Sequence, residues 1–346
     1  MNFLTIKRLR KPSPDPRYNL RLHRAEYGDN LKKKFDINSY YPDSNNLINS
    51  LSKFYKIHKK NITIGLGAEG IIKDIFLINF LKKKKCRILT SYPNFYMYNF
   101  YAKLFNFKFF TFPIIEENNE STNTNKIIKN IIKNKINFLI LVNPSSPIEK
   151  KWKKKEIIEI LNFCQNHKIK VLIDEVYNNK KEDSLVNLTK KYKNLIILNS
   201  FSKNFGMPGL RVGFCIADKN ISEELDTVRL AIELPAYSVN KATKIIKSYN
   251  TNIKKKINKI NSARKFAIKQ FDLLDLKTIN HSINSLTFFC KSEIEKKKLT
   301  FFLLKKKIFI NSNLPNSVML NVTTTNINNL KIFFKNLKIF YKYNSK

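Results

Sequence analysis

Five nearly uninterrupted apolar runs of strand length lie between residues 61 and 202, and helix-length stretches separate them. The runs are NITIGLG (61–67), CRILTSY (86–92), NFLILVNP (137–144), IKVLIDEVY (169–177) and NLIILNSFS (194–202). A strand covered on both faces needs apolar side chains at successive positions, as in a parallel sheet between helices. The alternation predicts an α/β fold with a mostly parallel, doubly wound sheet, whose ligand site lies where strands end.

The pattern changes near residue 240. The later segments are a long helical stretch (241–274), three strand-like segments, SLTFFC (285–290), KIFINS (307–312) and SVMLNVT (317–323), and a terminal helix (328–340). A chain of 346 residues can form one large domain or two moderate ones. We expect an N-terminal arm over 1–30 that packs with a small domain, a large domain over 31–240, and a smaller α+β domain over 241–346.

The formal net charge of +39 suggests nucleic acid or a membrane surface as a partner. However, the lysines are spread along the chain and accompany abundant Asn, Ile, Phe and Tyr, all of which have A/T-rich codons. We therefore attribute the charge to an AT-rich genome and to solvated faces. We expect no membrane partner and no nucleic acid, although a patch that binds nucleic acid stays an alternative.

Other features bound the class of protein. We find no run of 18 uninterrupted apolar residues and no signal-peptide core, so we expect no transmembrane helix. The four cysteines are far apart, which is typical of reduced, mostly buried thiols in a cytoplasmic protein. The four histidines are equally scattered, and we expect no metal site.

Glycine is scarce, and its positions are informative. Six of the seven glycines stand in two clusters: Gly65, Gly67 and Gly70 in ITIGLGAEGII, and Gly206, Gly209 and Gly213 in LNSFSKNFGMPGLRVGF. In a chain this poor in glycine, the remaining ones mark backbone that other residues cannot replace.

Both clusters have the features of an anion site. The later cluster surrounds Lys203 with two hydroxyls and a guanidinium, from Ser200, Ser202 and Arg211. The earlier cluster is a turn between a strand and a helix, where the amides of Ala68 and Glu69 can bind an anion. We expect the two clusters to bind one phosphate. The alternative is a surface lysine in a glycine-bearing loop.

The later cluster resembles the lysine segment of fold-type I, class I/II pyridoxal-phosphate (PLP) aminotransferases, in the group similar to histidinol-phosphate aminotransferase. The residues that carry the resemblance are Ser200, Ser202, Lys203, Gly206, Gly209, Arg211 and Gly213. It covers roughly residues 20 to 345. It implies the PLP-transferase fold type I, pyridoxal 5'-phosphate as cofactor, a Schiff base on Lys203 and transaminase activity.

A carboxylate and a tyrosine follow the strand IKVLID. Asp174 at the end of this strand can pair with the protonated ring nitrogen of PLP, and Tyr177 can hydrogen-bond the ring's 3-oxygen. The spacing resembles the Asp-Glu-x-Tyr segment of the same aminotransferases. The alternative for Asp174 is a helix N-cap.

Two aromatic residues enter through the resemblance. SYPNFYMY places Phe95 where the family stacks an aromatic ring on PLP; the alternative is that Phe95 belongs to the core. SYYPDSNN resembles a segment whose tyrosine reaches the phosphate in the neighbouring subunit, so Tyr41 has this role here. The resemblance therefore implies a homodimer with shared active sites.

The sequence departs from the family pattern at two places. In LVNPSSPIEK, Ser146 stands where the family has an asparagine that touches the cofactor, and Ile148 and Glu149 replace Thr-Gly. In VMLNVTT, Met319 stands where the family has the arginine that binds the substrate's α-carboxylate.

Three explanations for Met319 stay open. The substrate lacks an α-carboxylate, another arginine (Arg21, Arg24 or Arg229) substitutes, or the enzyme is degenerate. The early RLHRAEY resembles the family's substrate-side arm and makes Arg21, Arg24 and Glu26 weaker substrate candidates.

We therefore interpret the chain as an aminotransferase. In this interpretation, Lys203 also moves the proton between the substrate's Cα and the cofactor. The enzyme transfers an amino group between an amino acid donor and a small carbonyl acceptor, and phosphorylated or phosphonate-bearing acceptors are among the candidates. The alternatives are a PLP-dependent amino-acid decarboxylase of the same fold and a degenerate scaffold that binds nucleic acid.

Overall fold

A seven-stranded sheet is the centre of the computed structural model. The structure describes residues 42–83, 85–114, 122–146, 150–178, 180–279, 284–312, 314, 318–324 and 326–344. In sheet order the strands are β1 (Ile62–Leu66), β7 (Val212–Ala217), β6 (Leu195–Ser200), β5 (Lys170–Asp174), β4 (Phe138–Val142), β2 (Arg87–Tyr92) and β3 (Lys108–Pro113). From β6 to β3 all neighbours are parallel, whereas β7 is antiparallel to both β6 and β1. The predicted α/β fold with a mostly parallel sheet is confirmed.

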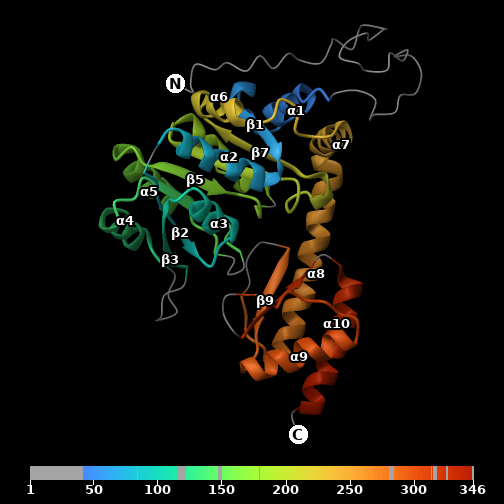
Figure 1. The fold of residues 1–346 in the computed structure, drawn as a ribbon. Helices are drawn as coiled ribbons and strands as arrows, with labels where there is room; N and C mark the ends of the chain where they lie inside the picture. The colour runs from blue at the N-terminus through green and yellow to red at the C-terminus, as the bar shows by residue number, and fades with distance from the viewer. Residues whose placement is uncertain are drawn as a thin grey trace, which may run out of the picture.

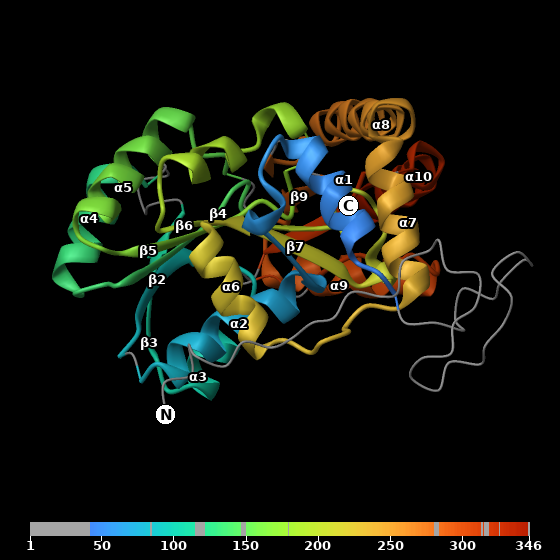
Figure 2. The same cartoon turned by 90° about the horizontal axis from the view of Figure 1, so that it is seen from above.

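Helices cover both faces of this sheet (Figures 1 and 2). One face is covered by α1 (Asn45–Tyr55), α4 (Thr124–Lys133), α5 (Lys154–Asn166) and α7 (Ala236–Lys247). The other face is covered by α2 (Gly67–Leu81), α3 (Met97–Leu104) and α6 (Lys219–Val228). Short helical turns lie at η2 (Lys59–Asn61), η3 (Lys181–Asp183), η4 (Val186–Lys190) and η5 (Pro208–Leu210).

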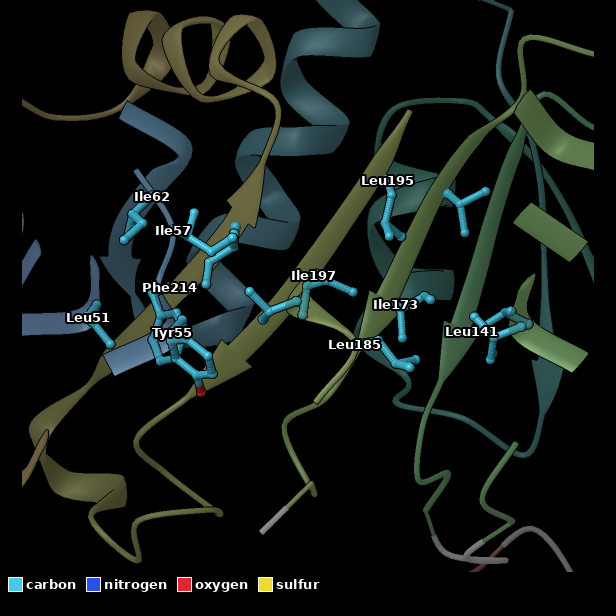
Figure 3. Packing of buried hydrophobic residues seen from close by; sticks show 14 of the residues in the cluster. Leu51, Tyr55, Ile57, Ile62, Leu141, Ile173, Leu185, Leu195, Ile197 and Phe214 are labelled. Atoms are coloured by element: carbon cyan, nitrogen blue, oxygen red, sulfur yellow. The ribbon is translucent and has the colours of Figure 1, made fainter. Parts of the chain in front are cut away.

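The burial of the strands explains their unbroken apolar runs. All five residues of β4 are buried. Leu139 and Leu141 join the hydrophobic cluster on the α5 face, part of which Figure 3 shows, while Phe138 and Ile140 join the cluster on the α2 face. Each cluster therefore contains every second side chain of the strand. Both faces of the strand are buried, so its sequence does not alternate between apolar and polar residues.

The five predicted strands are present, and two others were not predicted. β7 was missed because its apolar run, VGFCIA, overlaps the segment interpreted as a phosphate loop. β3 lies at the edge of the sheet, and its residues are more exposed than those of the central strands. An edge strand lacks the strong apolar run that identifies a central one.

A second, three-stranded antiparallel sheet follows α8 (Lys254–Asp272) in the chain and lies beside this helix (Figure 1). Its order is β10 (Met319–Thr323), β9 (Ser285–Phe289) and β8 (Thr278–Ile279). Side chains of α8, α9 (Glu293–Lys305) and α10 (Ile327–Asn344) share one hydrophobic cluster with it. None of the helices within the described ranges is both long and apolar enough to span a membrane.

The prediction needs several corrections in this part, and the short strand β8 is one element that it did not include. The helical stretch 241–274 is interrupted by a π-helical turn, η6 (Tyr249–Ile253), so α7 and α8 are separate helices. KIFINS (307–312) is not a strand, because only Asn311 pairs, in an isolated bridge with Asn321. Lys307 turns the chain there with a positive φ of 57°. The helix α9 was not predicted.

Candidate active site

The two glycine clusters lie side by side at one edge of the large sheet. Ser200 on β6 pairs with Gly213 on β7, which in turn pairs with Gly65 on β1. A Cβ atom on Gly213 would collide with the backbone of Gly67 and lie 2.5 Å from the amide nitrogen of Ala68. Only glycine allows this close approach of β7 to the turn that begins α2.

The first turn of α2 and Arg211 form an anion cradle. The N-cap residue Leu66 provides no side-chain hydrogen bond, so the amides of Ala68 and Glu69 have no capping side chain. Arg211 follows η5 in the left-handed region at φ 53°, and a Cβ on Gly67 would lie 3.0 Å from its Nη2 atom. A helix N-terminus beside a guanidinium fits a phosphate dianion.

The loop after β6 carries the predicted lysine and two serines. The Ser200 hydroxyl donates to Ser202 Oγ at 3.1 Å and accepts from the Ser202 amide at 3.1 Å. Lys203 follows directly, and its side chain is exposed. Its Nζ lies 5.8 Å from the centre of the Tyr177 ring, so Lys203 and Tyr177 are neighbours although they come from different loops.

Asn204, which the sequence reasoning missed, ties these two loops together. Its Nδ2 donates to Asn199 Oδ1 at 2.7 Å and to the carbonyl oxygen of Glu175 at 3.0 Å. The backbone next to Lys203 is thereby held to the end of β5. The only signal in the sequence was an asparagine beside the lysine, and its partner could not be inferred from the pattern.

Asp174 lies buried at the end of β5, with both carboxylate oxygens hydrogen-bonded. Oδ1 accepts from the Val176 amide at 2.9 Å, and Oδ2 accepts from the Tyr98 hydroxyl at 2.7 Å. Burial raises the pKa of Asp174, and these two hydrogen bonds oppose that rise. The described residues that follow Asp174 are not helical, so the alternative interpretation as a helix N-cap is wrong.

Phe95 is not a core residue. It precedes α3, is 38% exposed and meets the ring of Tyr98 edge-on with the centroids 6.1 Å apart. The core alternative is therefore wrong. Phe95 also approaches Asp174 through Tyr98, whose hydroxyl binds the carboxylate.

Of the predicted cofactor contacts that are left, the structure describes Ser146. Ser146 is half-buried and follows β4. It is close in sequence to Asn143, whose backbone amide donates a hydrogen bond to the carbonyl oxygen of Asp174 at 2.8 Å. The following predicted or discussed positions lie outside the described residues: Arg21, Arg24, Glu26, Tyr41, Ile148 and Glu149.

Arg229 is removed from the candidates for carboxylate binding. Its guanidinium is buried among three carboxylates, with Nη2 2.5 Å from Glu233 Oε2, Nη1 3.4 Å from Asp226 and Nε 3.8 Å from Asp74. A guanidinium whose donors are already paired with carboxylates in this way has no pair of N–H groups available to bind a substrate carboxylate. Met319 itself is a buried residue of β10.

The sequence profile of the family described as Aminotransferase class I and II matches residues 24–335. The chain belongs to this family. Histidinol-phosphate aminotransferase of Clostridium novyi (strain NT) is 29% identical over 296 residues, which cover 84% of this chain and 80% of that protein. The corresponding protein of Clostridium kluyveri is 31% identical over 256 residues, 72% of this chain and 70% of that one. The crystal structure of the enzyme from Clostridium acetobutylicum superposes with a TM-score of 0.77 at 23% identity, over 86% of this chain and 90% of that chain.

This aminotransferase is PLP-dependent and has fold type I. The residues present fit the cofactor: the cradle of amides and Arg211 suits its phosphate, and the buried carboxylate of Asp174 suits its ring nitrogen. Lys203 offers the amine. When bound, PLP supplies an electron sink for the electrons of the substrate's Cα–H bond.

The buried carboxyl of Glu175, next to Asp174 in the chain, is expected to make the free energy of unfolding depend on pH. Burial raises the pKa of Glu175 from 4.5 to about 7, although Ser184 and the Leu185 amide donate to it. A raised acid pKa means that the folded state holds a proton that the unfolded state has lost, so this contribution falls as the pH rises from 4.5 through about 7. For Glu175→Gln, the change in unfolding free energy over this range should shrink by about 2–3 kcal/mol.

Denaturant titrations of the wild type and Glu175→Gln at several pH values measure this difference. Glu159→Gln, at an exposed position of α5, is the matched control and should follow the wild-type curve. If the free energy of unfolding changed with pH in the same way for all three proteins, the assignment of this pH dependence to Glu175 would be contradicted.

Proposed function

We propose that this aminotransferase moves an amino group between an amino acid donor and a small carbonyl acceptor, with Lys203 as its catalytic lysine. The observation that carries the proposal is the convergence at strand ends of the Lys203–Tyr177 pair, the buried Asp174 carboxylate and the cradle at Gly67. Elements distant in sequence supply the three parts.

The proposed roles follow from the contacts. Lys203 would hold the cofactor covalently and then, as a free amine, would carry the proton of the substrate's Cα to the cofactor's C4′ carbon. Asn204 anchors the loop on which Lys203 lies. Asp174 pairs with the ring nitrogen, and Tyr177 donates to the ring oxygen. Phe95 stacks on the ring.

Seven further residues complete the proposed cofactor site. Ser200, Ser202, Arg211 and the amides of Ala68 and Glu69 bind the phosphate, in keeping with the register that joins β6, β7 and β1. Ser146 is a candidate contact to the ring oxygen. Tyr41 is proposed to reach the partner subunit's phosphate.

Arg211→Ala should weaken PLP binding about 10- to 100-fold, because it removes a charge-assisted hydrogen bond to the phosphate. Activity should persist in part at saturating PLP, since Lys203 and Asp174 are untouched. The measurement is a PLP titration of the apoprotein, with Arg87→Ala as control, because Arg87 binds the Asn134 carbonyl oxygen at 2.5 Å elsewhere on the sheet. An unchanged PLP affinity in Arg211→Ala would contradict the cradle.

The substrate class is proposed from Met319 and Arg229. Met319 supplies no charge at the expected carboxylate site, and Arg229 is occupied by Asp226 and Glu233. We therefore propose that the acceptor is bound through a group other than an α-carboxylate, such as a phosphate or phosphonate, or that Arg21 and Arg24 substitute. Glu26 is a further candidate in that segment.

An amino-donor screen tests this function. The purified holoenzyme is incubated with amino acids and phosphorylated amines in the presence of a 2-oxo acid that accepts the amino group, and both keto product and carbon dioxide are measured. Keto product with a phosphorylated amine supports the proposal. Carbon dioxide with no keto product would make the chain a decarboxylase of the same fold, and turnover of neither kind with any donor would indicate a degenerate scaffold.

We also propose a homodimer. Exposed apolar side chains border the cradle on the β1 side: Leu66 is 48% exposed and Leu230 is 66% exposed. Leu230 and Ile232 line the same surface hollow as Ile62 and Ile64 of β1. Exposed apolar surface at an edge strand favours contact with a second copy. Sedimentation measures the assembly, and a monomer would contradict it.

The division into domains and the location complete the proposal. Residues 31–240 would bind the cofactor and 241–346 would form the small domain. The third hydrophobic cluster, which draws all its members from residues 263–341, supports a separate core for the small domain, whereas α7 and the start of α8 pack in the cluster of the large sheet. The arm over 1–30 is proposed to pack with the small domain. The four cysteines are buried thiols, which supports a reducing compartment such as the cytoplasm.

A further inference from the structure

A tyrosine that the sequence reasoning did not identify contacts the buried carboxylate of Asp174. Tyr98, in the first turn of α3, is completely buried, and its hydroxyl donates to Asp174 Oδ2 at 2.7 Å. Its ring meets Phe95 edge-on. Tyr98 therefore touches both the proposed partner of the ring nitrogen and the proposed stacking residue, and α3 connects them.

We propose that Tyr98 is a positioning residue that aims the Asp174 carboxylate and keeps it ionised for the ring nitrogen of PLP. This inference rests on the proposed role of Asp174. Tyr98 itself does not touch the reacting atoms, because its hydroxyl is directed at the carboxylate.

The hydrogen bonds around Asp174 support this role. An ionised carboxylate has about four acceptor positions, and the Val176 amide and Tyr98 hydroxyl occupy one on each oxygen. Acceptor capacity is left for a third donor, such as the protonated ring nitrogen. Two fixed donors from different elements also hold the carboxylate plane in one orientation, which a single donor cannot do.

The Tyr98 hydroxyl also influences whether the Asp174 carboxyl is ionised. Burial favours the neutral carboxylic acid, and a hydrogen bond donated to the anion opposes this. The titratable neighbours that face the carboxyl are Tyr98 from α3 and, next along the chain, Glu175, which is itself bound by Ser184 and the Leu185 amide. Without the Tyr98 hydroxyl, Asp174 would take up a proton at a higher pH and could no longer pair with a protonated ring nitrogen.

A purely structural tyrosine is the competing explanation, and a matched pair of variants separates the two. Tyr98→Phe removes the hydroxyl and keeps the packed ring. Tyr192→Phe makes the same change at another buried tyrosine, whose hydroxyl donates to Asn162 Oδ1 at 2.7 Å on the opposite face of the sheet. Each variant removes one tyrosine hydroxyl and its hydrogen bond, and the thermal midpoints measure the stability that each loses.

The measurement is the PLP dissociation constant of each apoprotein between about pH 6 and about pH 8, with thermal midpoints in parallel. We expect Tyr98→Phe to bind PLP about tenfold more weakly than the wild type. Because its Asp174 would protonate first, the gap should widen as the pH falls. Tyr192→Phe should bind PLP like the wild type at every pH.

The possible failures are distinguishable. If the wild type forms no covalent link to PLP, the proposed function fails. If the wild type binds PLP and Tyr98→Phe has the same affinity and pH profile as Tyr192→Phe, only the role of Tyr98 is overturned.

Discussion

Replacing Lys203 by alanine is expected to lower the rate of transamination by about 10⁴-fold while leaving the thermal midpoint unchanged. The rate falls because the variant loses both the covalent attachment of the cofactor and the amine that carries the proton from the substrate's Cα. The fold is unaffected because the Lys203 side chain is exposed and lies over Tyr177 without a salt bridge in the described part of the chain. Single-turnover kinetics with a reactive donor measures the loss.

Lys155→Ala is the matched control for this experiment. Lys155 is also exposed, but it lies in α5, away from the strand ends that form the site. The control should retain wild-type activity and stability. Substantial turnover in Lys203→Ala would show that another group moves the proton.

Gly213→Ala is expected to destabilise the protein by about 3 kcal/mol or more, and to remove PLP binding in any folded fraction. The new methyl group would collide with the Gly67 backbone and the Ala68 amide. Backbone cannot rotate away as a flexible side chain can, so the turn that begins α2 must shift. That turn supplies the amides of the proposed phosphate cradle.

Gly209→Ala separates this clash from the general effect of adding a methyl group. A Cβ on Gly209 would meet no atom within 4 Å, so its unfolding free energy should change by less than about 1 kcal/mol. Denaturant unfolding and PLP titration of the two variants give the comparison. Equal stability of Gly213→Ala and Gly209→Ala would contradict the close packing of β7 against α2.

The sequence allowed much of the large sheet and part of the site to be predicted. Central strands such as β4 are buried on both faces, and this leaves an unbroken apolar run that is visible without a structure. Asp174 ends one such strand, Lys203 follows another run directly, and Gly67 begins the helix after a third. Their positions at strand ends therefore followed from the order of elements.

The supporting contacts could not be predicted in the same way. Tyr98 and Asp174 are 76 residues apart, and their hydrogen bond depends on how α3 packs against β5. Asn204 depends similarly on the distance between two loops. β7 was missed because one segment provides both the glycine turn and a strand, and the turn dominated its interpretation.

The most direct test of the account is the position of the lysine that binds PLP. The protein is loaded with PLP, treated with borohydride to make the covalent link permanent, digested, and examined by mass spectrometry. Mapping is essential because a chain with a net charge of +39 offers many competing amines. We predict that the pyridoxyl mass appears stoichiometrically on Lys203, and is lost from the mapped peptides of Lys203→Ala. Labelling spread over surface lysines, or concentrated on a different lysine, would contradict the account.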